Sequence, residues 1–207
     1  MLQAATLAPI PAFDEEAARA ELYGLLALLF YGPPTQELMA QLRLALTAAA
    51  ATGSVLEPPW RALVGSAREM TDEAIGAEYN ALFGGVGKPE VYLYGSHYLS
   101  GFLNEKPLAR LRTTLGQLGL TRDDSMPETE DHLAYLCEVM RYLIAGDDAA
   151  VANLTRQREF FAQHLQPWVA LLCADLEQHP KAHFYAALAA LTRSFMSVEA
   201  QGFDLLA

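Results

Sequence analysis

The sequence has few of the residues that build disulfide frameworks or nucleic-acid sites. It has only two cysteines, Cys137 and Cys173, which lie far apart in apolar helical patterns and form no CxxC motif, so we expect reduced core thiols. Basic residues are outnumbered by acidic ones, 14 against 25. The net charge of −11 argues against nucleic acid as a partner, because no stripe of lysine and arginine can neutralise phosphates. Such a surface favours a cationic partner, although many proteins are acidic for solubility alone.

Long hydrophobic runs and targeting signals are also missing. No uncharged run reaches the ~18 apolar residues of a membrane span, so we expect no stable membrane insertion. The first sixteen residues contain no lysine or arginine, unlike the positive start of a secretory signal peptide. The chain contains no Arg-Arg pair and therefore no twin-arginine export signal of its own. The expected location is the cytoplasm.

Runs of β-branched residues are scarce, whereas alanine and leucine are frequent, so the composition favours helix over sheet. With 52% hydrophobic and 19% charged residues, the chain is not disordered, and no repeat of fixed period suggests a solenoid. We predict an all-α fold, a single compact bundle of about nine or ten helices over residues 14–207. A flexible tail, residues 1–13, precedes it, and residues 121–125 are a possible hinge.

Apolar residues recur at helical spacing through most of the chain. We expect the first helices to begin at Asp14, at Thr35, after Pro58-Pro59 and near Thr71, the second one running to Gly53. The stretch from Gly84 to His97 has no helical period, and its glycine and tyrosine content is typical of a functional loop. Later helices are expected over residues 96–103, 107–119, 125–144, 151–165, 167–178 and from 184 onward.

The stretch from Ser125 to Ile144 is the most informative. It predicts one amphipathic helix that opens on a Ser125–Glu128 capping box. Neighbouring residues on a helix point about 100° apart, so Asp131 and His132 do not face each other as an acid–base pair merely because they are adjacent. A capping carboxylate with a half-buried histidine is an ordinary structural interpretation of both. The core stripe of this helix consists of Leu133, Leu136, Cys137, Met140, Leu143 and Ile144.

Three motifs point only superficially to other chemistry. The glycines after Phe83 lack the leading glycine of a phosphate loop, and Pro89 stands where it needs Ser or Thr. Gly95-Ser96-His97 lacks the flanking glycines of a hydrolase nucleophile elbow. His179 and His183 are four residues apart, but Pro180 lies between them and no zincin glutamate is present. We therefore predict no catalytic residue, no cofactor and no metal site.

Several dispersed segments together resemble one family. Glu128-Thr129-Glu130-Asp131-His132 is similar to the E-P-x-D-H signature of the TorD/DmsD/NarJ family of redox enzyme maturation chaperones, with Thr129 in place of proline. The other matching segments, in order, are Glu78-Tyr79-Asn80-Ala81-Leu82-Phe83, Gly95-Ser96-His97-Tyr98, His164-Leu165-Gln166-Pro167-Trp168 and Phe184-Tyr185-Ala186-Ala187-Leu188. Tyr94 stands where several relatives carry tryptophan before G-S, a change that bears on which peptides bind.

The resemblance implies a cytoplasmic chaperone rather than an enzyme. Its partners would be the twin-arginine signal peptide and the catalytic subunit of a molybdoenzyme, which it holds back from export until the molybdenum cofactor is inserted. A receptor for a cationic and apolar peptide needs carboxylates beside an aromatic groove. We expect Glu128 and Asp131 to accept the arginines and His132 to act as a hinge or hydrogen-bonding group. The remaining expected peptide-binding residues are Tyr79, Phe83, Tyr92, Tyr94, Ser96 and Tyr98.

Two alternatives stay open from the residues alone. An all-helical hydrolase using the same acidic pocket would show turnover or bound metal, and a non-catalytic dimerisation scaffold would show no affinity for signal peptides. Each aromatic residue named above is also typical of ordinary core. Relatives of this type occur as monomers and as homodimers, and the sequence does not distinguish the two.

Overall fold

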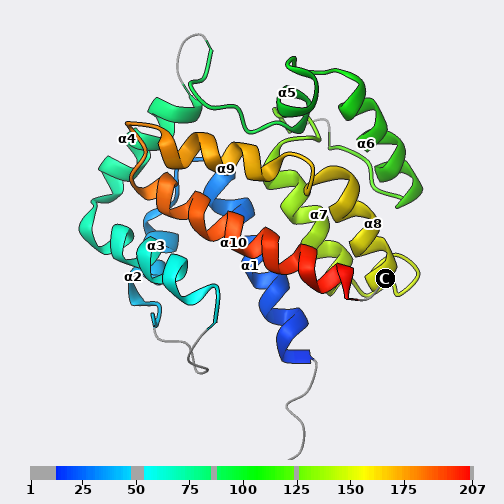
Figure 1. Cartoon of the computed structure of the whole chain (residues 1–207), viewed down its shortest axis with the longest axis horizontal. Helices are drawn as coiled ribbons and strands as arrows, with labels where there is room; N and C mark the ends of the chain where they lie inside the picture. Colours follow the sequence, from blue (N-terminus) through cyan, green and yellow to red (C-terminus); the bar gives the residue numbers. More distant parts are fainter. Residues whose placement is uncertain (1–12, 48–53, 85–87, 124–125, 206–207) are drawn as a thin grey trace, which may run out of the picture.

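The computed structural model describes residues 13–47, 54–84, 88–123 and 126–205. These ranges contain ten α-helices and no strand, which confirms the all-α prediction (Figure 1). Of the predicted tail only Phe13 is described, and the predicted hinge at 121–125 is described only in part. The helices are α1 (Phe13–Tyr31), α2 (Gln36–Leu44), α3 (Glu57–Glu69), α4 (Asp72–Phe83), α5 (Gly95–Ser100), α6 (Lys106–Gln117), α7 (Leu133–Ala145), α8 (Leu154–His164), α9 (Val169–Gln178) and α10 (Phe184–Asp204).

Two groups of packed helices organise the bundle. α1 packs along α7, and α10 packs along α9 and α3. In Figure 1, α2, α3 and α4 gather at one end of the molecule and α5, α6 and α8 at the other. One continuous core joins the two ends, and both cysteines are buried in it with free thiols, as expected. Its largest fully buried side chains include Trp168, Tyr23, Tyr185, Phe30 and Phe195.

Helix α7 corrects the most specific sequence prediction. All six residues of the predicted core stripe are buried, so the face was predicted correctly. The helix begins at Leu133 rather than Ser125, however, and the N-cap is His132. Pro127 and Glu128 lie before the helix, and Ser125 is outside the described residues. Segment 126–131 is thus irregular because it makes tertiary contacts in place of a first helical turn.

Helix α2 begins at its predicted cap, where the Thr35 hydroxyl accepts a hydrogen bond from the backbone N–H of Leu38 at 3.2 Å. It ends at Leu44, well before the predicted Gly53. The guanidinium of Arg68 in α3 donates to the carbonyl oxygens of Arg43 and Ala45 at 2.9 and 3.0 Å. These contacts satisfy carbonyls at the end of α2, so tertiary structure shortens a helix that alanine propensity alone would extend.

The first residues of α1 also differ from the prediction. Apolar spacing predicts a core stripe of Ala18, Leu22, Leu25, Leu26 and Leu29. Leu26 and Leu29 are fully buried as predicted, Leu22 and Leu25 are only partly buried, and Ala18 is exposed. The buried face of α1 also carries two large aromatic residues that this stripe omits, Tyr23 and Phe30.

Glu78, the first residue of one matching segment, anchors α4 to α10. Its buried carboxylate accepts hydrogen bonds from the backbone N–H groups of His183, Phe184 and Tyr185 at 2.9, 3.2 and 2.8 Å. A carboxylate at a helix N-terminus satisfies donors that have no partner inside the helix and faces the positive end of its dipole. Glu78 thereby joins two distant parts of the chain.

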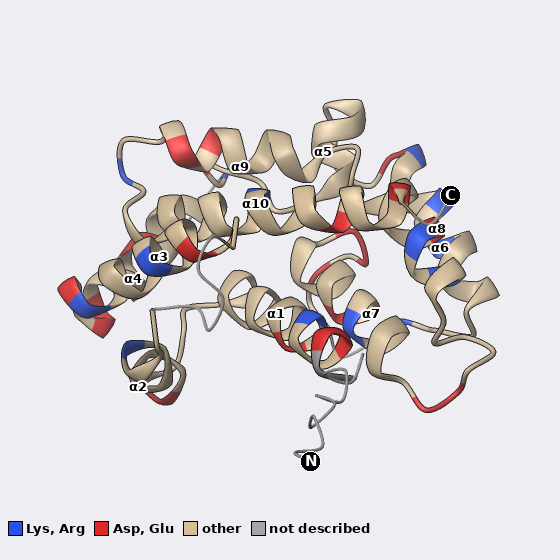
Figure 2. Ribbon diagram, turned by 60° about the horizontal axis from the view of Figure 1, so that its bottom comes forward, with Lys and Arg blue, Asp and Glu red and all other residues tan. Residues whose placement is uncertain are grey.

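Acidic and basic positions are both spread along the helices (Figure 2). Several of them pair between elements, for example Arg112 of α6 with Glu130 before α7 at 2.9 Å. Within the described ranges, none of the helices combines the length and the apolar character needed to span a bilayer.

Candidate functional site

The glycine- and tyrosine-rich connection before α5 runs alongside the acidic segment before α7. The backbone N–H of Leu133 donates to the carbonyl of Leu93 at 2.8 Å, and that of Gly95 donates to the carbonyl of Asp131 at 3.0 Å. An antiparallel bridge between Tyr94 and His132 lies between these two bonds. The structure therefore brings together two regions that the sequence analysis expected to meet, and we call residues 93–96 and 128–133 the junction.

Asp131 lies inside the junction. Its side chain is 3% exposed, and it accepts one hydrogen bond from the backbone N–H of Ser96 at 2.8 Å and another from the Thr129 hydroxyl at 2.7 Å. Ser96 is also fully buried, and a Cβ atom at Gly95 would lie 3.0 Å from the Trp168 indole nitrogen. The G-S pair and Asp131 thus fix the start of α5 against Trp168.

His132 is the N-cap of α7. Its Nδ1 accepts a hydrogen bond from the backbone N–H of Ala134 at 3.2 Å, and its ring packs edge-to-face on Tyr94. Burial lowers the pKa of His132 to about 4, although the nearby carboxylates Glu128 and Asp131 act in the opposite direction. The imidazole is therefore neutral at physiological pH, which the capping role requires because a protonated Nδ1 cannot accept a hydrogen bond.

Glu128 and Glu130 are the two carboxylates of the junction that stay partly exposed. Glu130 pairs with Arg112 at 2.9 Å, whereas Glu128 accepts a hydrogen bond from the hydroxyl of Tyr94. Burial is the largest cause that raises the pKa of Tyr94 above its ordinary range, and the hydrogen bond to Glu128 is the second. Burial and the charge of Glu128 also contribute to raising the pKa of Tyr79 to about 12. Burial, the Tyr31 hydroxyl and the Glu128 charge together raise the pKa of Tyr135 to about 12. Glu128 is thus a negative charge among neutral phenol groups.

The predicted aromatic residues divide among three ring clusters. Tyr94 belongs to a row that continues through His132 and Tyr135 to Tyr31, with centroid separations of 5.1, 5.8 and 5.9 Å. We call this row the tyrosine row. Each of the other two clusters includes at least one fully buried aromatic ring. Tyr79 and Phe83 pack on Phe30 and Tyr185, and Tyr92 and Tyr98 pack on His97 and Trp168.

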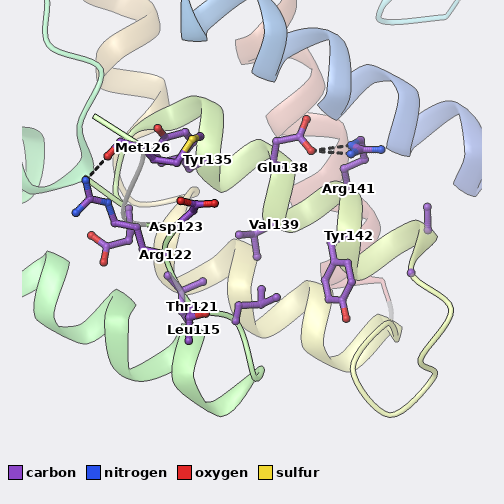
Figure 3. A pocket seen from close by; sticks show the side chains of 14 residues that line it. Leu115, Thr121, Arg122, Asp123, Met126, Tyr135, Glu138, Val139, Arg141 and Tyr142 are labelled. Carbon is purple, nitrogen blue, oxygen red and sulfur yellow. Dashed lines mark hydrogen bonds and ion pairs between the residues drawn. The ribbon is translucent and has the colours of Figure 1, made fainter. Parts of the chain in front are cut away.

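A groove beside the junction was missed by the sequence analysis. It runs along the outer side of α7, and Figure 3 shows Tyr135, Val139 and Tyr142 of that helix on one wall and Leu115 of α6 on the other. Its volume is about 550 Å³. A signal for it was present, because Tyr135, Val139 and Tyr142 recur at i, i+4 and i+7, a second apolar stripe on the same helix.

Within the described residues, the histidines of the motifs that the sequence analysis set aside have other partners. His179 pairs with Glu90 at 3.0 Å, and the backbone N–H of His183 donates to Glu78. Residues 85–87 of the glycine-rich stretch lie outside the described part. Within that described part, no group of three or more His, Cys, Asp or Glu side chains converges as a metal site would require.

Comparison with known proteins decides the family. The model of the family described as nitrate reductase delta subunit matches residues 33–174, more than half of the chain. The chain belongs to this nitrate reductase delta subunit family. The resemblance to TorD/DmsD/NarJ proteins is thereby confirmed, and the matched residues of this family include α2 to α8 and the whole junction.

Curated relatives of this delta subunit family member are called chaperone protein TorD. The one from Aliivibrio fischeri is 27% identical over 208 residues, covering 92% of this chain and 95% of that protein. The one from Vibrio parahaemolyticus is 23% identical with the same coverage of both chains. A Vibrio cholerae relative is 27% identical over 146 residues, 67% of this chain and 66% of that protein. The prediction of a chaperone rather than an enzyme is confirmed.

A solved structure supports the fold of this family member. The crystal structure of a redox enzyme maturation protein from Archaeoglobus fulgidus superposes with a TM-score of 0.53 and 16% sequence identity, covering 96% of this chain and 99% of that one. The two proteins share an all-helical architecture despite low identity, so the fold assignment stands on structure as well as on sequence.

Proposed function

We propose that this chain is a cytoplasmic, system-specific chaperone that binds the twin-arginine signal peptide and the immature catalytic subunit of a molybdenum-containing oxidoreductase. It would delay export of that enzyme until the cofactor has been inserted. One observation carries the peptide-binding part of the proposal. Glu128, within the segment that resembles the family signature, is a partly exposed carboxylate surrounded by tyrosine side chains.

The surroundings of Glu128 suit a guanidinium group. A carboxylate accepts two parallel N–H···O bonds from arginine, and such charge-assisted pairs are stronger than neutral ones. Tyrosine faces nearby can also attract the cation. The hydroxyl of Tyr94 orients Glu128 before the guest arrives, so less side-chain freedom is lost on binding.

The other predicted site residues take different parts in this proposal. Asp131 and Ser96 hold the backbone of the junction, and His132 holds the start of α7, so these buried groups act through position rather than by contact with the arginines. Tyr79 would support Glu128 from α4, where its hydroxyl donates to the Tyr31 carbonyl at 2.9 Å. Phe83 and Tyr98, whose rings pack on buried aromatic residues, and Tyr92, whose ring stacks on His97, would form the aromatic backing of the site.

The test is a calorimetric titration with synthetic peptides that carry paired arginines before an apolar stretch. Glu128→Gln removes the charge but keeps the size of the side chain, and we expect affinity to fall at least about tenfold, or ~1.4 kcal/mol. The melting temperature should change little, because Glu128 is partly exposed. Glu69→Gln, an exposed site at the end of α3, is the matched control and should bind as the native chain does.

Replacing both arginines of the peptide with glutamine should abolish the difference between the native chain and Glu128→Gln. If Glu128→Gln binds the paired-arginine peptide as tightly as the native chain, Glu128 is not the arginine acceptor. If the native chain binds none of a panel of peptides from different molybdoenzymes, the proposed function itself is wrong.

A further inference from the structure

We infer that the outer groove of α7 holds the apolar, helical stretch that follows the paired arginines of the guest peptide. This inference rests on the proposed function and goes beyond it, because it assigns a second subsite on a surface that none of the residues predicted from sequence touches. Its lining includes Tyr135, Val139 and Tyr142 of α7, with Leu115 of α6 facing them in Figure 3, and Leu120.

Helix α7 carries apolar residues on two faces. The inner face is buried in the core, and the outer face presents Tyr135, Val139, Tyr142 and Ala145, spaced at i, i+4, i+7 and i+10. Tyr142 is 40% exposed. A helix at the surface of a globular protein normally turns polar residues toward solvent, and a contiguous apolar strip there marks an interaction surface.

A second hollow extends the groove toward α1. It has a volume of about 190 Å³ and is lined by Leu28 and Tyr31 of α1 together with Met126. It shares Met126, Tyr135 and Glu138 with the larger groove, so the two form one continuous surface beside α7. Leu28 is 58% exposed, which adds a further apolar side chain at this end.

Three of the charged side chains at the rim, Glu130, Glu138 and Arg141, form ion pairs. Glu138 forms an ion pair with Arg141 at 2.8 Å, drawn in Figure 3, and Glu130 pairs with Arg112 at 2.9 Å. The guanidinium of Arg122 donates to the carbonyl of Met126. An apolar guest bound between these pairs would remove little unpaired charge from water. A charged guest would have to displace one partner of an existing ion pair.

The tyrosine row connects this groove with Glu128. Tyr94 hydrogen-bonds to Glu128, and the row continues through His132 to Tyr135 and Tyr31, both of which line the groove. An arginine held at Glu128 therefore places the next part of the guest at the start of the groove. From Tyr135 to Ala145 the outer face extends about 15 Å, the rise of roughly ten helical residues. That length suits a helix with apolar anchors at i, i+4 and i+7.

The test compares two fluorescent peptides, one with paired arginines followed by a leucine- and alanine-rich stretch and one that ends after the arginines. Tyr142→Glu places a charge on the α7 wall of the groove, and Leu171→Glu, at an α9 residue that is 52% exposed, is the matched control. We expect Tyr142→Glu to weaken the long peptide at least about tenfold and to leave the short peptide unchanged. Glu128→Gln should weaken both peptides, and Leu171→Glu neither.

A photoreactive residue seven positions after the arginines gives a direct readout. Its crosslinks to the native chain should fall within residues 135–146, read by mass spectrometry of the digested adduct. If Tyr142→Glu binds the long peptide with unchanged affinity, or if the crosslinks are confined to α9 and α10, the groove is not the binding site of the apolar stretch. The proposed function then still stands. Binding of neither peptide by the native chain overturns both.

The other possible occupant is a second copy of this chain. Sedimentation of the native chain and of Tyr142→Glu, each without peptide, separates the two cases. A native monomer agrees with a groove open to the guest. A native dimer that Tyr142→Glu converts into a monomer overturns the inference, because the groove is then covered by its own partner.

Discussion

Asp131 shows how burial changes the meaning of a motif residue. The sequence places an acidic side chain next to His132 in a segment similar to a family signature, and arginine binding is a natural expectation. In the folded chain its oxygens already accept hydrogen bonds from Ser96 and Thr129, and the side chain is almost inaccessible. Glu128, three positions earlier, stays partly exposed, and it is the residue that we propose meets the guest.

Asp131→Asn should therefore lower stability more than peptide affinity. The amide keeps acceptor capacity but loses the charge that strengthens the bonds from Ser96 and Thr129, and we expect a loss of about 1–3 kcal/mol in the free energy of unfolding. Urea denaturation measures the loss, and peptide titration at a temperature where the variant is fully folded measures affinity. A variant of native stability with weakened peptide binding would restore the direct role that the sequence analysis expected for Asp131.

His132 makes the fold sensitive to acid. Its folded pKa of about 4 lies below the ordinary 6.5, so the unfolded chain takes up the proton at a higher pH than the folded chain does. The stability contributed by the neutral imidazole is complete above pH 6.5 and is lost as the pH falls toward 4. The loss over that window is on the order of 3 kcal/mol for this group.

His132→Asn should flatten this dependence, because asparagine caps a helix but does not titrate. The measurement is the slope of the free energy of unfolding against pH between 6.5 and 4, compared between the native chain and His132→Asn. Burial also lowers the pKa of His164 to about 4, so part of the slope will remain in this variant. An unchanged slope would mean that His132 is protonated in the folded chain.

At the scale of elements, helix ends depend on partners from elsewhere in the chain. The N-terminus of α10 is satisfied by Glu78 of α4, and α2 ends where Arg68 of α3 takes its last carbonyls. The start of α7 is held by the pairing of segment 93–95 with residues 131–133. These ends determine where Glu128 and the tyrosine row lie relative to α7.

Glu78→Gln should destabilise the chain by about 1–3 kcal/mol, because the neutral amide cannot hold three backbone N–H groups as a carboxylate does. Thermal unfolding followed by circular dichroism measures the change, with Glu69→Gln as the exposed control. Hydrogen exchange at residues 183–185 should accelerate more than exchange in α7. Equal acceleration in both helices would argue against a local role at α10.

At the scale of the whole molecule, one buried polar network ties α1, α8 and α10 together. Arg19 donates to both oxygens of Glu199 at 2.7 and 2.8 Å and to Gln157 at 3.2 Å. The hydroxyl of Tyr23 donates to Glu199 at 3.0 Å, and the side-chain amide of Gln157 donates to the Leu143 carbonyl in α7 at 3.0 Å. This network joins the long helices α1 and α10 to α7 and to α8.

Glu199→Ala should cost about 3–5 kcal/mol, since it leaves the Arg19 charge and the Tyr23 hydroxyl without their acceptor. The double variant Arg19→Met with Glu199→Leu should recover a large part of that loss, because the remaining charge is removed and the space is filled. The free energy of unfolding of the native chain, the single variants and the double variant, measured with denaturant, gives a double-mutant cycle. A double variant as unstable as Glu199→Ala would show that packing, rather than the unpaired charge, dominates the cost.

The sequence by itself determined the helical class, the buried face of α7 and the family, because periodic burial and short local motifs depend on residues close together in the chain. It also indicated that the segments around Gly95 and Asp131 act together. Three features came only from the folded structure: α7 starts at Leu133 with His132 as its N-cap, Asp131 is buried while Glu128 stays partly exposed, and a second apolar face of α7 borders a groove. Each of these depends on which distant backbone groups and side chains pair, and spacing within one segment does not encode that pairing.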